Sequence, residues 1–416
     1  MKKFAKIMCL ILALSMLVAC MSGCASSAKT EAEKSAQADT EAEAPAAEEA
    51  APAEEGGEIV IALITNTTGD YAQYGIPVHN GAMLYIDQLN EAGGINGKQI
   101  KVLEYDDKAD GVESVNAFNL ACDKGITAVI GSVLTGATIA LADATYEVNM
   151  PQITASATAA GVTVIEDTNE IRTNVFRSCF IDPFQGEKMA DYAYNVLGAA
   201  TAAVFYQTGN DYSEGVMQAF VDKAADLGLE IVASEAFAEG DKDYKAQMTN
   251  IAAKNPDVVF APIYYAEAGL AVTQARQAGL TATFLGGDGF GSIKDYASAE
   301  DLEGTVYCSG YAPGTDSVAQ FEADYQTVYG EAVPNMFAPL AYDAAMIMCE
   351  GLKAAEEAGL TAGTEEYKQA VIDAIASMDG VAGITGTYSF DENNNPIKSA
   401  AIIELTGGDE VFKEMY

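Results

Sequence analysis

The chain has 416 residues, half of them hydrophobic and a fifth charged, so it is long enough for two domains and apolar enough to bury a core in each. The formal net charge is −39, which argues against nucleic acid and against anionic lipid headgroups as partners, because like charges repel. We interpret the acidity as a source of solubility.

The N-terminal residues predict export. A short basic segment, MKKFAK, precedes the apolar run IMCLILALSMLVA, which is too short for a membrane anchor. LVAC at residues 17–20 then resembles a lipobox, where a signal peptidase cuts before a cysteine that carries lipid. We therefore expect a lipoprotein signal peptide at residues 1–19 and lipidation of Cys20, with Cys24 as the alternative and an ordinary cleaved signal less favoured. The protein would then lie outside the cytoplasm, at the bacterial cell surface or in the periplasm, tethered to the membrane only by acyl chains.

The segment from Cys20 to residue 57 is rich in Ala and Glu and contains no aromatic residue. Such a composition cannot bury a core, because it offers too little apolar surface to offset the entropy of ordering the chain. We expect a flexible acidic stalk here.

From Glu58 onward, short β-rich runs alternate with helical patterns. The expected strands are 58–63, 99–106, 126–131 and 151–154, and the helices between them are 77–94, 112–125 and 137–148. Alternation of this kind predicts a parallel sheet covered by helices on both faces.

The alternation restarts after a junction near residues 174–183. The second set of strands is 201–207, 229–235, 257–265 and 282–287, with helices at 211–228, 244–255 and 267–279. The remaining patterns are a strand within 304–313, helices at 317–330 and 338–359, and strand-like runs at 386–390 and 399–405. Two α/β units are therefore expected.

Few residues are suited to catalysis or metal binding. The single histidine, His79, nearly excludes His-based triads and multi-His metal sites, and neither G-x-S-x-G nor G-x-G-x-x-G occurs. The run DENNNP at Asp391 begins like a calcium loop, but Pro396 stands where glycine is needed, so we predict a turn. The acidic strand end at residues 104–110 is explained as well by a solvated strand end as by a metal site. We expect no enzyme activity, no cofactor and no metal.

Four cysteines follow the signal region, at positions 122, 179, 308 and 349, without the close spacing of metal ligands. Small buried hydrophobic side chains are the simplest interpretation, and disulfides remain open.

Small, polar and aromatic residues gather after the expected strands, where ligands bind in open α/β sheets. The loops concerned are TNTTGDYAQYG, GSVLTGAT and TASAT in the first unit and QTGNDYSEG, PIYYAEAG and GGDGFGS in the second. In GSVLTGAT the glycines have the spacing of a phosphate loop, yet no lysine follows. Backbone N–H groups at a helix N-terminus and one hydroxyl can satisfy a singly charged carboxylate without a lysine.

These motifs, in this order, resemble the branched-chain amino acid (leucine/isoleucine/valine) binding proteins of ABC importers, which have the type I periplasmic binding fold. The markers are GDYAQYG, NEAGGINGKQIKVLEYDD, AVIGSVLTGAT, YYAEAGLAVTQARQAGL and GGDG. The resemblance implies two Rossmann-like lobes, parallel sheets flanked by helices, joined by a three-strand hinge. It places lobe 1 at residues 58–176 and 313–390 and lobe 2 at 177–312 and 391–416. It also implies a monomer that delivers a hydrophobic amino acid to ABC permease subunits with cytoplasmic ATPases.

The resemblance further assigns a set of ligand-binding residues. Thr135 matches the hydroxyl that holds the ligand carboxylate, and Asp288 matches the acid that pairs with the ligand ammonium. The other matching positions are Tyr74, Ser156, Thr158, Tyr212, Tyr264 and Phe337.

Two departures from the family pattern leave the exact ligand open. The acid is often Glu in the family, and Ala109 and Leu134 replace a cysteine pair of the enteric members. The alternatives are an amide or urea-like solute, a short peptide, or a sensor that reports its ligand to a signalling partner. Individual residues also have simpler interpretations: Thr135 as a helix cap, Asp288 as a turn residue, and His79 as structural.

Overall fold

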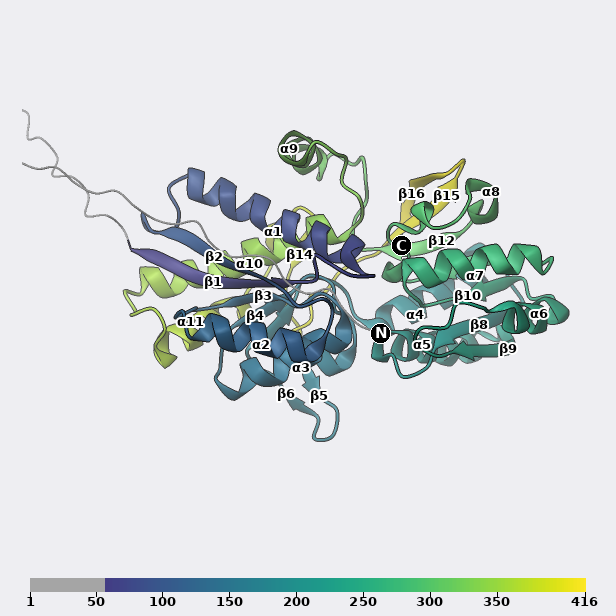
Figure 1. Ribbon diagram of the computed structural model, residues 1–416, viewed down its shortest axis with the longest axis horizontal. Helices are drawn as coiled ribbons and strands as arrows, with labels where there is room; N and C mark the ends of the chain where they lie inside the picture. Colours follow the sequence, from purple (N-terminus) through teal and green to yellow (C-terminus); the bar gives the residue numbers. More distant parts are fainter. Residues whose placement is uncertain (1–56) are drawn as a thin grey trace, which may run out of the picture. The chain divides into compact units, whose positions relative to one another are not determined.

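The computed structural model describes residues 57–416, and its first half is built on a five-stranded parallel sheet in the order β2-β1-β3-β4-β7 (Figure 1). The strands are β1 (Glu58–Thr65), β2 (Gln99–Asp106), β3 (Val129–Gly131), β4 (Gln152–Thr154) and β7 (Val175–Arg177). Helices α1 (Ala72–Glu91), α2 (Gly111–Cys122) and α3 (Thr135–Glu147) connect the first four strands. A small hairpin, β5 (Val164–Ile165) and β6 (Glu170–Ile171), precedes β7.

A second sheet has seven strands in the order β16-β15-β12-β11-β10-β8-β9. Five of them are parallel: β8 (Thr201–Gln207), β9 (Glu230–Phe237), β10 (Val258–Phe260), β11 (Thr283–Gly286) and β12 (Val306–Ser309). The antiparallel strands β15 (Ala401–Thr406) and β16 (Asp409–Met415) complete one edge. The helices are α4 (Asp182–Asp191), α5 (Asp211–Leu227), α6 (Lys245–Lys254), α7 (Tyr265–Gln277) and the short α8 (Ala299–Leu302).

The chain returns to the first sheet after β12. Helix α9 (Ala319–Tyr329) leads into α10 (Phe337–Glu357), which packs along α1 and against α11 (Glu365–Ala376). The hairpin of β13 (Val381–Gly383) and β14 (Gly386–Tyr388) then precedes β15 of the second sheet. The chain therefore passes between the two sheets three times, after β7, β12 and β14.

Both sheets are covered on two faces, as the alternation of elements predicts. In the first half α1 and α10 cover one face and α2 and α3 the other (Figure 1). In the second half α4 and α5 pack on one face and α6 and α7 on the other. Strands enclosed in this way are mostly apolar, and β3, β4, β7 and β10 are buried along their whole length. The buried polar residues among them, Gln152, Thr154 and Arg177, all make hydrogen bonds.

Polar side chains in the loops after β2 and β8 cap the N-termini of α2 and α5. Asp110 accepts hydrogen bonds from the backbone N–H groups of Val112 and Glu113 and so caps α2. Asn210 caps α5 in the same way by accepting from the N–H of Ser213. The cap at Asn210 fixes the turn of QTGNDYSEG, one of the loops in which a ligand site is expected.

Several expectations about elements are corrected. Helix α1 starts at Ala72 and contains Pro77, which lies in its second turn, whereas the sequence predicted a start at the proline. Strand β10 ends at Phe260, so Tyr264 and Tyr265 lie at the start of α7 and not at the end of a strand. Helices α4 and α11 and strands β7 and β16 were not predicted.

The acidic strand end at residues 104–110 is not uniformly solvated. Asp107 is fully buried and accepts hydrogen bonds from the hydroxyls of Ser114 and Ser132. The interpretation as solvated residues is therefore wrong for Asp107, which ties α2 and the loop after β3 to the end of β2. Its exposed neighbour Lys108 has a left-handed backbone that completes the turn.

Other expectations concern the turn at Asp391, the cysteines, metal sites and membrane spans. Asp391 accepts hydrogen bonds from the N–H groups of Asn393 and Asn395, so DENNNP forms a turn. The four cysteines of residues 57–416 are free thiols, three of them buried. Among these same residues no group of His, Cys, Asp or Glu is arranged to hold a metal, and no helix has the length and apolarity to cross a membrane. The expected signal peptide, Cys20, Cys24 and nearly all of the stalk lie outside the described residues.

Candidate ligand-binding site

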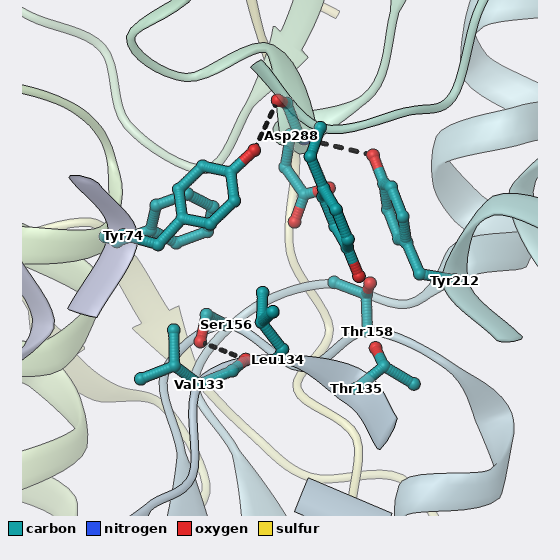
Figure 2. Close-up of a pocket in the computed structure, with 11 residues that line it drawn as sticks. Tyr74, Val133, Leu134, Thr135, Ser156, Thr158, Tyr212 and Asp288 are labelled. Carbon is teal, nitrogen blue, oxygen red and sulfur yellow. Dashed lines mark hydrogen bonds between the residues drawn. The ribbon is translucent and has the colours of Figure 1, made fainter. Parts of the chain in front are cut away.

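A pocket lies where loops from both sheets meet, and all eight residues predicted for the site line it (Figure 2). The lining residues are Tyr74, Val133, Leu134, Thr135, Ser156, Thr158, Tyr212, Tyr264, Asp288, Gly289 and Phe337. The pocket holds about 270 Å³ of space not filled by atoms, part of it open to solvent.

One end of the pocket is the N-terminus of α3. The N-cap position is Leu134, whose side chain cannot cap, and the first intrahelical bond runs from the N–H of Thr138 to the carbonyl of Leu134. The N–H groups of the first turn therefore have no partner within the helix. Thr135 is the first helical residue, so it is not the cap that the simpler interpretation proposed, and its hydroxyl makes no hydrogen bond to another described side chain or backbone group. This end offers donors and the positive pole of a helix to an anion.

The loop after β4 adds two hydroxyl residues beside α3. The hydroxyl of Ser156 donates to the carbonyl of Val133 over 2.7 Å and so joins this loop to the loop after β3. The hydroxyl of Thr158 is buried and has no hydrogen-bond partner within residues 57–416. Thr158 is therefore a polar group free to meet a ligand, whereas the Ser156 side chain is already engaged.

The opposite end of the pocket is formed by Asp288, which follows β11. Its side chain is 3% exposed, and its Oδ1 atom has no hydrogen-bond partner within the described residues. Burial raises the pKa of Asp288 to about 7, although hydrogen bonding to Tyr212 and Gln185 lowers it in part. A buried carboxylate without a cation is strongly destabilised, so this end is suited to a positively charged group.

The glycines on either side of Asp288 are required by close packing. A Cβ atom at Gly287 would lie 2.6 Å from Oε1 of Gln185, and one at Gly289 would lie 2.7 Å from the carbonyl oxygen of Ile263. Both contacts are shorter than van der Waals distance. The GGDG motif therefore lets the Asp288 loop pass between α4, α5 and the segment before α7.

Backbone hydrogen bonds hold the Asp288 loop in place. The N–H of Asp288 donates to Oε1 of Gln185 over 2.8 Å, and the N–H of Gly289 donates to the hydroxyl of Tyr212 over 3.0 Å. From the side of the first sheet, the hydroxyl of Tyr74 donates to the carbonyl of Gly289 over 2.6 Å (Figure 2). The loop that carries the acid is thus bonded to both halves of the protein.

Four aromatic rings form the apolar wall. Tyr212 and Tyr264 are stacked, with centroids 5.3 Å apart and an interplanar angle of 8°. Tyr74 meets the ring of Phe337 edge-on at 4.9 Å. Phe337 is the first residue of α10, a helix that the chain reaches only after leaving the second sheet. Of the tyrosine pair at the start of α7, Tyr264 lines the pocket, whereas Tyr265 packs against Tyr74 and donates its hydroxyl to the carbonyl of Asp70.

The site contains residues that the sequence did not single out as contacts. Val133, Leu134 and Gly289 line the pocket, and Gln185 lies behind Asp288. Gly289 could have been inferred from the sequence, because it directly follows the predicted contact Asp288. Gln185 has none, because it belongs to α4, which was not predicted.

A fold of two α/β halves with a polar and aromatic pocket between their strand ends defines a binding protein for a small molecule. Comparison with known proteins leads to the same class of protein. Residues 58–409 match the family model described as "Periplasmic binding protein". The chain therefore belongs to the periplasmic binding protein family, with the type I fold and of the branched-chain amino acid type. Proteins of this family bind solutes outside the cytoplasm and are not enzymes.

Relatives and solved structures extend the similarity along almost all of the described chain. The Leu/Ile/Val-binding protein BraC3 of Rhizobium johnstonii is 29% identical over 81% of this chain and 89% of its own length. A leucine-, isoleucine-, valine-, threonine- and alanine-binding protein of Pseudomonas aeruginosa is 31% identical over 72% of this chain and 79% of its own.

Two structures are similar at a TM-score of 0.77 over 86% of this chain. The leucine-binding protein LivK of Thermotoga maritima is 30% identical and covered over 98% of its length. The branched-chain amino acid transporter substrate-binding protein LivJ of Streptococcus pneumoniae, in complex with isoleucine, is 31% identical and covered over 99%.

Proposed function

We propose that this protein binds one free hydrophobic amino acid in the pocket and delivers it to an ABC permease. The observation that carries the proposal is a pair of buried acceptors without partners, Oδ1 of Asp288 and the hydroxyl oxygen of Thr158, in the same pocket as an uncapped helix N-terminus. An ammonium group supplies donors to the acceptors, and a carboxylate accepts from the helix. An α-amino acid carries both groups on one carbon.

The missing lysine in the loop after β3 supports a zwitterionic ligand. A lysine beside Thr135 would place a second cation near the ligand ammonium and would repel it. The helix N-terminus alone favours an anion by about 0.3–1 kcal/mol, and by up to about 2 kcal/mol when partly buried. Asp288 provides the complementary negative charge at the other end.

The remaining walls favour an apolar side chain on the ligand. The four aromatic rings, together with Val133 and Leu134, offer no further charged group. A neutral amide or urea would leave Asp288 without a cation. Two relatives named for leucine, isoleucine and valine support the same choice.

The two poles of the ligand would be held by different lobes, and this supports a hinged closure. We propose that lobe 1 comprises residues 58–176 and 313–390 and lobe 2 residues 177–312 and 391–416, joined by the three connections between the sheets. The N-terminus of α3 with Thr135 comes from lobe 1 and Asp288 from lobe 2. Only the closed form then gives both buried charges a partner, so the ligand shifts the population toward closure. We further propose a monomer anchored through lipid on Cys20, or alternatively on Cys24.

Isothermal titration calorimetry tests the binding proposal. We expect heat with L-leucine, L-isoleucine or L-valine, and none with 4-methylpentanoic acid, which lacks the ammonium group, or with 3-methylbutylamine, which lacks the carboxylate. The absence of heat with every common amino acid would defeat the proposal. Equal binding of the amine would show that α3 does not hold a carboxylate.

A further inference from the structure

Two tyrosines near the N-termini of α1 and α7 pack against each other where the two halves of the protein meet. Tyr74 lies in the first turn of α1, and Tyr265 is the first residue of α7. Their rings meet edge-on with the centroids 4.6 Å apart, and both side chains are buried. One ring therefore comes from each α/β half.

The hydroxyl group of each tyrosine is bonded to the opposite half. Tyr265 donates its hydroxyl to the carbonyl of Asp70, just before α1, over 2.6 Å. Tyr74 donates its hydroxyl to the carbonyl of Gly289, in the loop after β11, over 2.6 Å. The two bonds cross the junction in opposite directions, and we call the pair Tyr74 and Tyr265 the tyrosine clasp.

The clasp also caps α7. The N-cap position of this helix is Tyr264, whose side chain makes no capping hydrogen bond. The N–H of Tyr265 has no acceptor within the helix, because it belongs to the first turn, and it donates instead to the hydroxyl oxygen of Tyr74 over 3.2 Å. A helix of the second half is thus capped by a side chain of the first half, and it loses this cap when the halves separate.

Tyr265 is the member of the clasp that does not touch the pocket. Tyr74 lines the pocket, whereas Tyr265 is not among the lining residues. The connection from Tyr265 to the site runs through the Tyr74 hydroxyl to Gly289, the neighbour of Asp288. A change at Tyr265 can therefore weaken the hold of one half on the other while every ligand contact is kept.

We infer that Tyr265 is a positioning residue that holds the site closed and so sets how long the ligand stays bound. Opening must break both hydroxyl bonds of the clasp and remove the cap of α7. A ligand that approaches the open form meets a site in which these bonds are not yet made, so the clasp should act on the dissociation rate and not on the association rate. The inference rests on the proposed function, because it assumes that an amino acid binds by hinged closure.

Stopped-flow fluorescence with L-leucine tests the inference in Tyr265→Phe, which keeps the ring and removes the hydroxyl. The dissociation rate should rise about three- to tenfold, the range expected for one neutral hydrogen bond, and the association rate should stay the same. The same factor is expected with L-isoleucine, because Tyr265 does not line the pocket. An unchanged dissociation rate, or a slower association in its place, would overturn the inference.

Tyr329→Phe is the matched control, because it removes a similar bond within the proposed lobe 1. The hydroxyl of Tyr329 donates to the carbonyl of Asn80 over 2.8 Å. Its loss should lower the stability of the ligand-free protein in urea unfolding and leave the dissociation rate unchanged. Tyr265→Phe should show the opposite pattern, since the open form does not contain the clasp. If Tyr265→Phe behaves like the control, Tyr265 has only a structural role and the inference is lost.

Hydrogen exchange at the backbone amide of Tyr265 provides a second measurement that needs no variant to fold. In the unaltered protein, saturating L-leucine should slow this exchange, because closure brings the Tyr74 hydroxyl to the amide as its acceptor. Equal protection with and without L-leucine would show that the clasp does not open, and this would also overturn the inference.

Failure of this inference is distinguishable from failure of the proposed function. If calorimetry shows that the unaltered protein binds L-leucine and Tyr265→Phe releases it at the same rate, only the positioning role is lost. If the unaltered protein binds no amino acid, both are lost.

Discussion

Replacing Asp288 by Asn should weaken ligand binding but stabilise the ligand-free protein. The substitution preserves shape but removes the charge that would pair with the ligand ammonium. Removing one partner of a buried ion pair costs about 3–5 kcal/mol, so the dissociation constant for L-leucine should rise by roughly two to three and a half orders of magnitude. The free protein should be affected in the other direction, because it no longer has to bury an unpaired carboxylate.

The size of the stabilisation of the ligand-free protein follows from the pKa of Asp288, which rises from 3.8 to about 7 in the folded protein. Between these two values the folded state holds a proton that the unfolded state has lost, so the stability of the free protein falls as pH rises from about 4 to 7. A shift of this size corresponds to roughly 4 kcal/mol at pH 8 as an upper limit. Asp288→Asn avoids that loss, so its unfolding temperature without ligand should exceed that of the unaltered protein at pH 8 and not at pH 4.

The same pKa sets the pH dependence of binding. Below about pH 7 the ammonium must displace the proton from Asp288, so affinity for L-leucine should fall about tenfold for each pH unit and should level off above pH 7. Another acid that acts electrostatically on this carboxylate is the buried Asp182, and the hydroxyl of Tyr212 and the side chain of Gln185 also contact the Asp288 loop. Asp288→Asn should remove the slope between pH 5 and 7.

Thermal unfolding with and without L-leucine at pH 5, 6, 7 and 8, together with calorimetry, measures both effects. Asp226→Asn, an exposed acid on α5 outside the pocket, is the control and should behave like the unaltered protein. The reasoning is refuted if Asp288→Asn binds L-leucine as tightly as the unaltered protein. Loss of binding without any gain in stability at pH 8 would show that the carboxylate is not destabilised in the free protein.

Three other substitutions test separate contacts. Tyr74→Phe removes the hydrogen bond to the Gly289 carbonyl but keeps the ring, so calorimetry should show a loss of about 1–2 kcal/mol in binding, and an unchanged affinity would mean that this bond does not contribute to the ligand-bound form. Gly289→Ala places a methyl group 2.7 Å from the carbonyl of Ile263 and should reduce stability by about 1–3 kcal/mol in urea unfolding as well as weaken binding; full retention of both would contradict the close packing of this loop. Cys20→Ser should abolish incorporation of labelled palmitate in cells whereas Cys24→Ser should not, and the reverse result would move the anchor to the second cysteine.

The sequence alone determined the class of fold and most of the pocket. Strands β2 and β8 have the bounds that the sequence predicted. Strand β8 lies inside its sheet and is buried along most of its length, so its run is largely apolar, whereas the edge strand β2 carries polar and charged residues between its apolar ones. The loops that follow the strands of a parallel sheet meet at one edge of it, so the loops GSVLTGAT and GGDGFGS were expected near a ligand. The resemblance to one family supplied the individual residues, and all eight lie in one pocket.

What the sequence did not reveal depends on contacts between distant segments. Helix α4 is short, contains several polar residues and directly follows the junction near residues 174–183, so it has no clear helical pattern in the sequence, and Gln185 and Asp182 were missed with it. Only tertiary packing shows that Asp107 is buried, because its partners Ser114 and Ser132 come from other elements. Burial and hydrogen-bond partners are properties of the assembled sheets, and the raised pKa of Asp288 follows from them. The tertiary structure alone could therefore decide which acids near the pocket lack a partner.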